Sequence, residues 1–318
     1  MTASGPPGDR ITALIERLGH VGARLRKPLP ETDTGPLEID LWLPRSAAPA
    51  ADELLLWAGF HRLVAPGNVP HRFYLACNDG IWTKIDAKLD PPGRRPWRPV
   101  QTLRRRAPSA RRRLGPVIAF VGPDGAGKST LVSRVAATIP VATEVSYLGA
   151  HRNRRSSPNG ASGETPSRGA VHRRWLKNKL EPVFVSRTLL RHIRTLVGVY
   201  AGAWRGRIIL CDRHPVEALA IDPRTTRTAR TLERVVVGRL LPFPDRVVVL
   251  DAPAAVMFAR KGEHDEARLD HWRSGYRTEL VPRGATVVST AGDLDVAQAA
   301  CSDLVWEALG ERRGWPST

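Results

Sequence analysis

The stretch "VIAFVGPDGAGKSTLVSRV", residues 117–135, sets the architecture of the second half of the chain. Five apolar residues precede a glycine-rich turn, and a segment with helical character follows it. Gly122, Gly127, Lys128 and Ser129 satisfy the spacing G-x-x-x-x-G-K-[ST]. In that pattern backbone N–H groups turn inward, the helix start adds its dipole, and the lysine reaches the outer phosphates. The sequence therefore predicts a strand, a phosphate-binding loop and a helix that begins at Lys128.

Apolar, strand-like segments alternate with helical segments after this stretch. The predicted strands are residues 117–121, 144–148, 208–211, 246–250 and 286–288. Strands separated by helices imply parallel crossovers, and a parallel sheet is normally covered on both faces. The fold class predicted for this half is α/β, with a parallel sheet covered by helices on both faces.

A long helical region before the third of these strands carries an apolar stripe. Val185, Leu189, Ile193, Leu196 and Tyr200 recur at spacings of three and four, and arginines lie off the stripe. A basic amphipathic helix can lie on a membrane surface, or it can pack on a sheet or on a second subunit. We expect the packed arrangement.

A carboxylate follows the third predicted strand, in "RIILCDRHP". A phosphate-binding loop needs a metal-side carboxylate at the end of a neighbouring strand, and Asp212 is in that position. Arg213 follows it directly. The sequence therefore predicts Ser129 and Asp212 as ligands of a magnesium ion.

Six motifs together resemble thymidylate kinases, in which they occur in the same order. They are "GPDGAGKST" at 122–130, "DRH" at 212–214, "PDRVVVLDAP" at 244–253, "FARKGEHDEAR" at 258–268, "GYRTEL" at 275–280 and "ATVVSTAGDLD" at 285–295. The resemblance spans residues 116–318. It implies a P-loop kinase fold that uses ATP and Mg²⁺, and it is compatible with a homodimer.

The resemblance implies a nucleotide site around the loop. The residues that it assigns to nucleotide binding are Gly122, Pro123, Asp124, Gly125, Ala126, Gly127, Lys128, Ser129, Thr130, Arg260, Thr290 and Ala291. Arg260 would begin a lid and stack on adenine, which Thr290 and Ala291 would also contact. Lys261 and Arg268 would close over the transferring group.

The catalytic set that the resemblance implies is Lys128, Asp212, Arg213 and Arg268. Asp212 would assist magnesium or the acceptor, and Arg213 would hold the acceptor's phosphate or the phosphoryl group in flight. Asp124 would face the hydroxyls of the acceptor. Phosphoryl transfer depends mainly on positioning and charge neutralisation, so a set of this kind favours a kinase over a plain ATPase.

Two segments depart from the family in the region that selects the acceptor. The family carries an arginine-glutamate-proline-glycine stretch where this chain has "YLGAHRNRR", residues 147–155. It also has a tyrosine-glutamine pair where this chain has Ala220, Ile221 and Asp222. We therefore expect a nucleotide-like or other small-molecule acceptor rather than thymidylate. Arg152, Arg154 and Arg155 either bind an anionic acceptor or are solvated charge.

Residues 1–90 predict a smaller α/β domain. Helical periodicity marks residues 11–18, alternation marks a strand at 38–44, and a second helix over residues 50–58 is closed by Gly59. The stretch 71–90 indicates a hairpin that turns at Asn78-Asp79-Gly80.

This part of the chain resembles the core of nucleotidyltransferase-like proteins over residues 18–90. In that family two acids on one strand and a third on a later strand hold two metal ions. Glu38, Asp40 and Asp86 match those positions. The alternative, which we favour, is a degenerate domain that binds or presents an acceptor.

The segment 91–115 is rich in proline and arginine and is predicted to link the two domains. Its arginines either bind nucleic acid or acidic lipid, or belong to a solvated connector, which we favour. Two alternative functions stay open: a nucleotidyltransferase with a regulatory ATP-binding half, and an ATP-switched nucleic-acid-binding protein.

Composition places the chain among ordinary globular proteins. It is 42% hydrophobic and 25% charged, and 49 lysines and arginines against 31 acids give a formal charge of +18. This surplus is typical of a protein with polyanionic partners, although genomic base composition can also produce an arginine bias. Three widely spaced cysteines, no signal peptide and no membrane-spanning segment predict a cytoplasmic protein.

Overall fold

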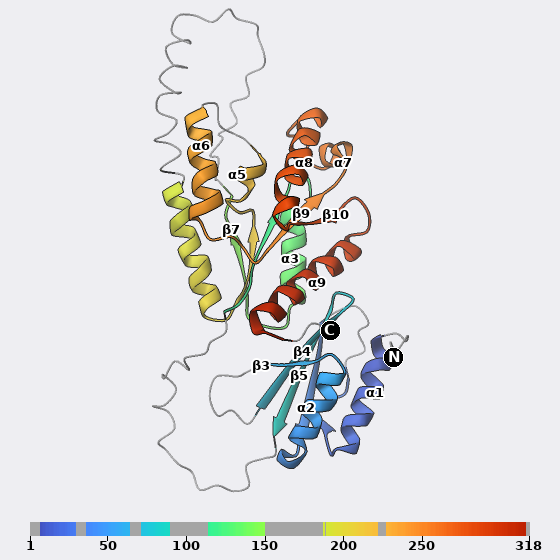
Figure 1. The fold of residues 1–318 in the computed structure, drawn as a ribbon. Coiled ribbons are helices and arrows are strands. Elements are labelled where there is room, and N and C mark those ends of the chain that lie inside the picture. Colours follow the sequence, from blue (N-terminus) through green and yellow to red (C-terminus); the bar gives the residue numbers. More distant parts are fainter. Residues whose placement is uncertain are drawn as a thin grey trace, which may run out of the picture. The chain divides into compact units, whose positions relative to one another are not determined.

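The computed structural model describes residues 7–29, 36–63, 71–89, 114–149, 187, 189–221 and 227–315 (Figure 1). The described residues form two compact units. The first unit comprises residues 1–114, 134–142 and 298–318, and the second comprises 115–133 and 143–297. Most of the predicted linker, the arginines at 152–155, Val185 and Asp222 lie outside the described residues.

A five-stranded parallel sheet forms the centre of the second unit, and the predicted parallel α/β architecture is confirmed. Its strand order is β10-β9-β6-β8-β7. The strands are β6 (Val117–Val121), β7 (Thr143–Tyr147), β8 (Ile208–Asp212), β9 (Arg246–Asp251) and β10 (Thr286–Ser289). Each end lies within one residue of its prediction, and β6, β8 and β9 are the strands that are buried along nearly their whole length.

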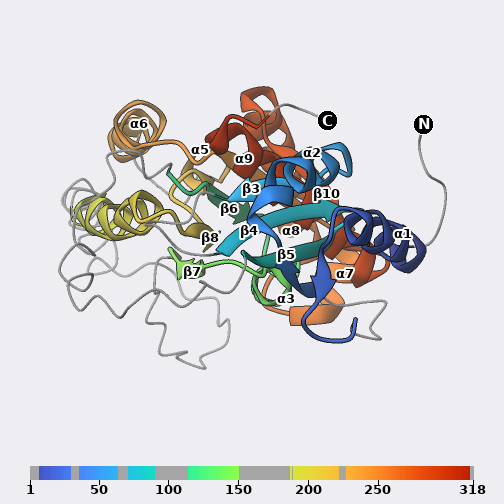
Figure 2. The ribbon, with the colours of Figure 1, turned by 90° about the horizontal axis from the view of Figure 1, so that it is seen from below.

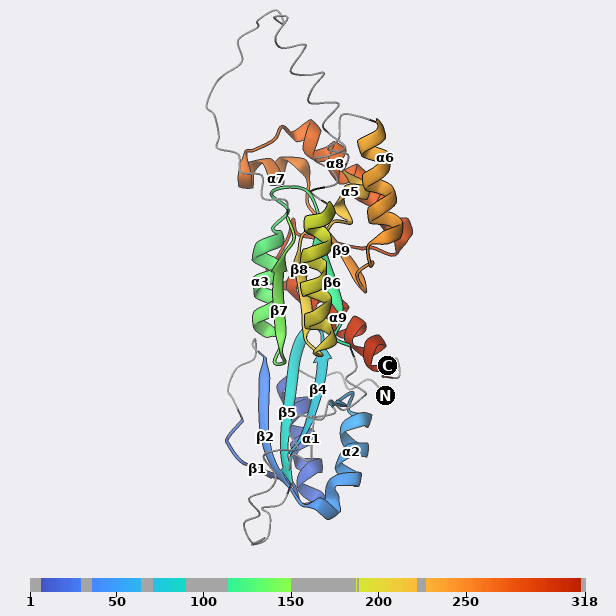
Figure 3. The same cartoon turned by 90° about the vertical axis from the view of Figure 1, so that its left-hand side faces the viewer.

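Helices flank this sheet. They are α3 (Lys128–Thr138), α5 (Glu217–Ala220), α6 (Arg227–Val235), the π-helix η3 (Val236–Leu240), α7 (Ala254–Lys261), α8 (Glu266–Leu280) and the short 3-10 helix η4 (Val281–Arg283). Residues 189–204 are also helical. Figures 2 and 3 show α3 on one side of β7 and β8 and the helix 189–204 on the other.

The helix 189–204 buries most of the described part of the predicted stripe, with Tyr200 packed against the same cluster and Ile193 as the exception. Leu189 and Leu196 are buried as expected, but Ile193 is 42% exposed. The buried stripe continues through Val199 and Ala203, which pack with them against the second unit's sheet. Since a residue turns about 100° around a helix axis, Ile193 lies at the border of this stripe.

A mixed five-stranded sheet forms the first unit, in the order β1-β2-β5-β4-β3. Its elements are α1 (Pro7–His20), β1 (Arg24–Leu25), β2 (Leu37–Leu43), η1 (Arg45–Ala47), α2 (Ala48–Trp57), β3 (His61–Leu63), β4 (His71–Asn78) and β5 (Ile81–Leu89). Strands β2 and β5 are parallel, and the other pairs are antiparallel. The predicted hairpin is confirmed: Asp79 (φ 51°) and Gly80 (φ 75°) make its turn.

The two faces of this mixed sheet differ. Alternate residues Ile39, Leu41 and Leu43 of β2 are buried in one apolar cluster with residues of α1 and α2, and Figure 3 shows both helices on the same side of the sheet. On the other face, Trp82 meets Trp306 of α9 (Leu294–Arg313) edge to face, with ring centroids 5.6 Å apart. Asp40 and Asp86 lie on this second face, where their side chains are 20% and 24% exposed.

Among the described helices, none combines the length and apolarity that crossing a bilayer requires.

Candidate functional site

The loop after β6 depends on glycine at two close approaches. Gly122 (φ 149°) and Gly125 (φ 88°) have backbone angles that side chains disfavour. A Cβ on Gly122 would lie 2.5 Å from the Leu250 carbonyl oxygen, and one on Gly125 would lie 2.5 Å from that of Met257. The loop is therefore packed directly against β9 and α7, which explains the glycine that the predicted spacing requires at residue 122.

Lys128 begins α3, as predicted, and its side chain turns back under the loop. The side chain is only 6% exposed, and its ammonium donates to the carbonyl oxygens of Gly122 and Pro123, both at 2.7 Å. Burial lowers the pKa of Lys128 to about 8. Two carbonyl oxygens accept its hydrogen bonds, and the Asp124 carboxylate lies 4.0 Å away. An anion bound beside the ammonium would therefore stabilise this buried charge.

Ser129 and Asp212 are brought together as the sequence predicts. Pairing of β6 with β8 sets Phe120 beside Asp212, and the Ser129 hydroxyl donates to Asp212 Oδ2 at 2.6 Å. Asp212 is buried, and its Oδ1 finds no hydrogen-bond partner among the described residues. A hydroxyl beside an unpartnered buried carboxylate oxygen is a donor set of the kind that Mg²⁺ prefers, so these residues fit the predicted cation.

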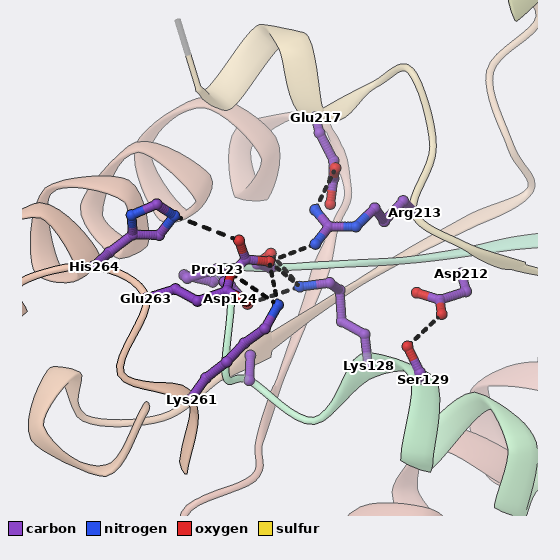
Figure 4. A network of polar contacts seen from close by, with 12 residues as sticks. Pro123, Asp124, Lys128, Ser129, Asp212, Arg213, Glu217, Lys261, Glu263 and His264 are labelled. Carbon is purple, nitrogen blue, oxygen red and sulfur yellow. Dashed lines mark hydrogen bonds and ion pairs between the residues drawn. The ribbon is translucent and has the colours of Figure 1, made fainter. Parts of the chain in front are cut away.

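Asp124, from the middle of the loop, is the centre of a second group of charges. Figure 4 shows it between His264 on one side and Arg213 on the other. It contacts Arg213, and its carboxylate lies 3.6 Å from His264 Nε2, 3.9 Å from Lys261 Nζ and 4.0 Å from Lys128 Nζ. Burial opposes its ionisation, but the charges of Arg213 and Lys128 outweigh burial and lower the pKa of Asp124. It therefore acts as a hydrogen-bond acceptor in the ionised form.

Arg213 is held at both ends of its guanidinium. One nitrogen contacts Asp124 and the other lies 3.6 Å from Glu217 Oε2. Its backbone is left-handed (φ 70°), an uncommon conformation for a side-chain-bearing residue, and its N–H donates to the Phe120 carbonyl at 3.0 Å. The predicted arginine is thus oriented by its backbone and by two carboxylates.

Glu217 was not predicted from the sequence. It begins α5, four residues after Arg213, and that spacing is the only sequence signal that could have found it. Burial raises the pKa of Glu217 despite the nearby charges of Lys128 and Arg213. The Gly122 N–H and the Tyr276 hydroxyl also face this carboxyl.

The connection between α7 and α8 supplies two further residues that the sequence did not indicate. Glu263 and His264 have ligand atoms within 4.8 Å of one another and of an Asp124 oxygen. Lys261 Nζ, however, lies 3.2 Å from Glu263 and 3.9 Å from Asp124, which already compensates both carboxylates. We therefore assign no metal to this cluster.

The residues predicted on the adenine side are also partly brought together. Arg260 donates to the Thr290 carbonyl at 2.8 Å, and the Thr290 hydroxyl donates to the Ala126 carbonyl at 3.1 Å. The Ala291 N–H faces Ser289 Oγ at 3.4 Å. Thr290 thus links the loop to the carboxyl end of β10.

Two predicted residues do not converge on this group. The guanidinium of Arg268 lies over the Trp272 ring at 4.9 Å and its backbone N–H caps to Asp265, so among the described residues its contacts stay within the α8 region. Thr130 is exposed in the first turn of α3.

Asp251, another residue that the sequence did not indicate, anchors α8. This buried carboxylate at the end of β9 accepts from Arg273 Nε at 2.5 Å and from Arg277 at 2.6 Å. Its backbone carbonyl accepts from the Thr290 N–H at 2.8 Å. Helix α8 is therefore anchored to the carboxyl end of β9, at the same end of the sheet as the loop.

His214 is buried and neutral. Its Nδ1 accepts from the Val216 N–H at 3.2 Å, so the ring proton is on Nε2. Burial lowers the pKa of His214 to about 3. His151, the other histidine of the DRH and loop segments, lies outside the described residues.

The acidic trio of the first unit is only partly assembled. Register pairs Asp40 of β2 with Asp86 of β5 directly, whereas Glu38 is opposite Lys84, whose Nζ lies 2.9 Å from it. The side chain of Glu38 is 62% exposed. Two of the three predicted acids are therefore neighbours, and the third is engaged with a lysine.

Basic side chains already contact this pair of acids. Lys27 Nζ lies 2.7 Å from Asp40 and lowers the pKa of that carboxyl, and His71 Nδ1 lies 2.6 Å from Asp86. Arg26 lies between them, 3.7 Å from Asp40 and 3.8 Å from Asp86. A divalent ion at this place would have to displace these contacts.

No protein-family model and no curated protein matches the chain.

Proposed function

We propose that the protein is an ATP- and Mg²⁺-dependent phosphotransferase that moves the terminal phosphoryl group of ATP to a small-molecule acceptor. The observation that carries the proposal is the arrangement of Lys128, Ser129 and Asp212. A buried ammonium lies at the amino end of one helix, beside a buried carboxylate oxygen that has no hydrogen-bond partner among the described residues and a loop whose glycines allow close backbone approach.

On the donor side, each of these residues has a distinct task. The loop N–H groups and the start of α3 bind the phosphate oxygens, and Lys128 adds a positive charge at the outer phosphates. Ser129 and Asp212 would hold Mg²⁺, which neutralises charge on the transferring group. Thr290 and Arg260 support the loop from the side assigned to the base.

On the acceptor side, Asp124 and Arg213 favour transfer over simple hydrolysis. Asp124 stays ionised and is suited to accept a hydrogen bond from an acceptor hydroxyl. Arg213 is preorganised next to it, and a positioned guanidinium stabilises the charge that develops during phosphoryl transfer. Lys261 and His264 reach the same carboxylate from the α7–α8 connection.

The acceptor is a nucleotide-like or other small molecule. The resemblance to thymidylate kinases supports the kinase assignment, and the departures at Ala220 and Ile221 stand against thymidylate itself.

Transfer of labelled phosphate tests the proposal. The protein is incubated with ATP labelled in the terminal phosphate, Mg²⁺ and a panel of nucleosides, nucleotides and sugars, beside matched Lys128→Ala and Asp40→Ala variants. We expect labelled product with the unchanged protein and with Asp40→Ala, and loss of product with Lys128→Ala. ATP hydrolysis without transfer to any panel member would count against a kinase. Pyrophosphate release that survives Lys128→Ala and disappears in Asp40→Ala would assign the chemistry to the first unit as a nucleotidyltransferase.

A further inference from the structure

Figure 4 shows Glu217 above the guanidinium of Arg213, at a different terminal nitrogen from the one that contacts Asp124. The side chain of Glu217 is 16% exposed, and its Oε2 lies 3.6 Å from the Arg213 guanidinium. The buried Tyr276 hydroxyl and the Gly122 N–H both lower the pKa of its carboxyl, although the hydroxyl and Glu217 Oε1 make no hydrogen bond among the described residues. One acidic side chain therefore adjoins the predicted arginine, the first glycine of the phosphate loop and helix α8.

The position of Glu217 affects how the guanidinium of Arg213 is oriented. Because the group is planar and its two terminal nitrogens face different carboxylates, Asp124 and Glu217 together fix its rotation. Asp124 alone could not, since it also faces Lys128, Lys261 and His264 and has several cations to compensate. Glu217 has no cation closer than Arg213 among the ion pairs of the described residues.

The charges near Glu217 agree with this role. Burial lowers the pKa of Arg213, but the charges of Glu217 and Asp124 outweigh burial and raise it above its ordinary value. The left-handed backbone at Arg213 orients the base of the side chain, and Glu217 orients its end.

We propose that Glu217 is a positioning residue, which holds the guanidinium of Arg213 toward Asp124 and the phosphate loop. It acts through Arg213 and touches no reacting atom. The proposal rests on the proposed phosphotransferase function for its effect on turnover, but the orientation of Arg213 is measurable without any turnover.

Guanidinium rotation is the direct readout. Nuclear magnetic resonance follows rotation about the Cζ–Nε bond of Arg213, whose signal is assigned by its loss in Arg213→Lys. In the full-length protein without ligand, we expect Glu217→Ala to speed this rotation about tenfold, as loss of a charge-assisted contact implies. Glu217→Gln keeps the size and an acceptor oxygen but loses the charge, so its rate should fall between the two.

Two variants guard against trivial outcomes. Glu279 lies on α8, far in sequence from the loop, and contacts Arg234 and Arg283. Glu279→Ala should therefore leave the rotation rate of the Arg213 guanidinium unchanged. Tyr276→Phe removes the hydroxyl that faces Glu217 and keeps the ring, so it tests the same support if Glu217→Ala does not fold.

Turnover then separates positioning from structure. With ATP, Mg²⁺ and the acceptor that gives labelled product, Glu217→Ala should lower kcat about 10- to 100-fold and change the KM for ATP less than about twofold, because misplaced charge affects the transition state most. Unchanged Arg213 rotation in both Glu217→Ala and Glu217→Gln would overturn the proposal. Faster rotation in a protein that transfers no phosphate would support the positioning of Arg213 and contradict the phosphotransferase assignment instead.

Discussion

The phosphate loop of the second unit and the acidic pair of the first unit both bring carboxylates and cations together, but with opposite results. Within the part of the chain that the structure describes, one buried oxygen of Asp212 has no hydrogen-bond partner beside the Ser129 hydroxyl. Asp40 and Asp86 already have a lysine and a histidine at 2.7 Å and 2.6 Å. Spacing of acids on strands therefore does not by itself make a metal site. What decides is whether the fold leaves carboxylate oxygens for the metal or satisfies them with its own cations.

The largest expected effect comes from the buried ammonium of the loop. Replacement of Lys128 by methionine removes a charge whose burial lowers its pKa from 10.5 to about 8, which corresponds to roughly 3 kcal/mol of unfavourable free energy below pH 8. We expect Lys128→Met to raise the free energy of unfolding at pH 7 by up to about 3 kcal/mol, measured by urea denaturation.

The sign of the pH dependence sharpens this prediction. Between pH 8 and 10.5 the unfolded chain binds the Lys128 proton more tightly than the folded protein, so stability of the unchanged protein rises with pH there. Lys128→Met should lack that rise. Lys84→Met, on the first unit's sheet, is the control and should change stability little. If the free energy of unfolding depended on pH in the same way in Lys128→Met and in the unchanged protein, the pKa of Lys128 would not be lowered by folding.

Next in size is a matched pair of carboxylate substitutions. Asp212→Asn should weaken binding of the ATP–Mg²⁺ complex about 10- to 100-fold, because it removes a charged ligand of the cation, and Asp86→Asn should change it less than twofold. Titration calorimetry with and without Mg²⁺ measures both. An equal loss in both variants would erase the distinction between the two regions.

A buried histidine tests the packing behind the loop. His214 has its pKa lowered to about 3 from 6.5, so the folded protein takes up its proton later than the unfolded chain as the pH falls. Stability is thus lost between pH 6.5 and 3, by about 2 kcal/mol at pH 5. His214→Gln should show a smaller loss from pH 7 to pH 5 in urea denaturation. His20→Gln, at an exposed residue of α1, should not, and identical losses in all three proteins would be inconsistent with a buried neutral His214.

The smallest expected effect is at the edge of the acidic trio. Glu38 pairs with Lys84 on an exposed surface, and such pairs contribute from zero to about 1 kcal/mol. Glu38→Ala should change the free energy of unfolding by less than about 0.5 kcal/mol. A loss of several kcal/mol in urea denaturation would show that this acid has a role that its exposure does not suggest.

Much of the second unit could be predicted because its signals are local. Each predicted strand of the parallel sheet ends within one residue of the observed one, and the loop spacing places the start of α3 at Lys128. Asp251 and His264 could not be predicted in the same way, because their partners Arg273 and Asp124 lie 22 and 140 residues away in the sequence. No local pattern marks a residue whose role is set by tertiary contact.

The first unit shows the complementary limit. Alternation along β2 and β5 predicts that Asp40 and Asp86 share the less buried side of their strands, but parallel register alone places them side by side. The side chains that contact the two acids, Arg26, Lys27 and His71, lie outside β2 and β5 and belong to no recognisable motif. The sequence therefore predicts the acids but not the basic side chains that contact them.

Binding of ATP with Mg²⁺ is the measurement that tests the central claim most directly. Calorimetric titration compares the unchanged protein with Lys128→Ala and with the double variant Asp40→Ala, Asp86→Ala. Our account predicts one site per chain, lost in Lys128→Ala and kept with unchanged affinity in the double variant. Binding that persists in Lys128→Ala and is lost in the double variant would contradict it.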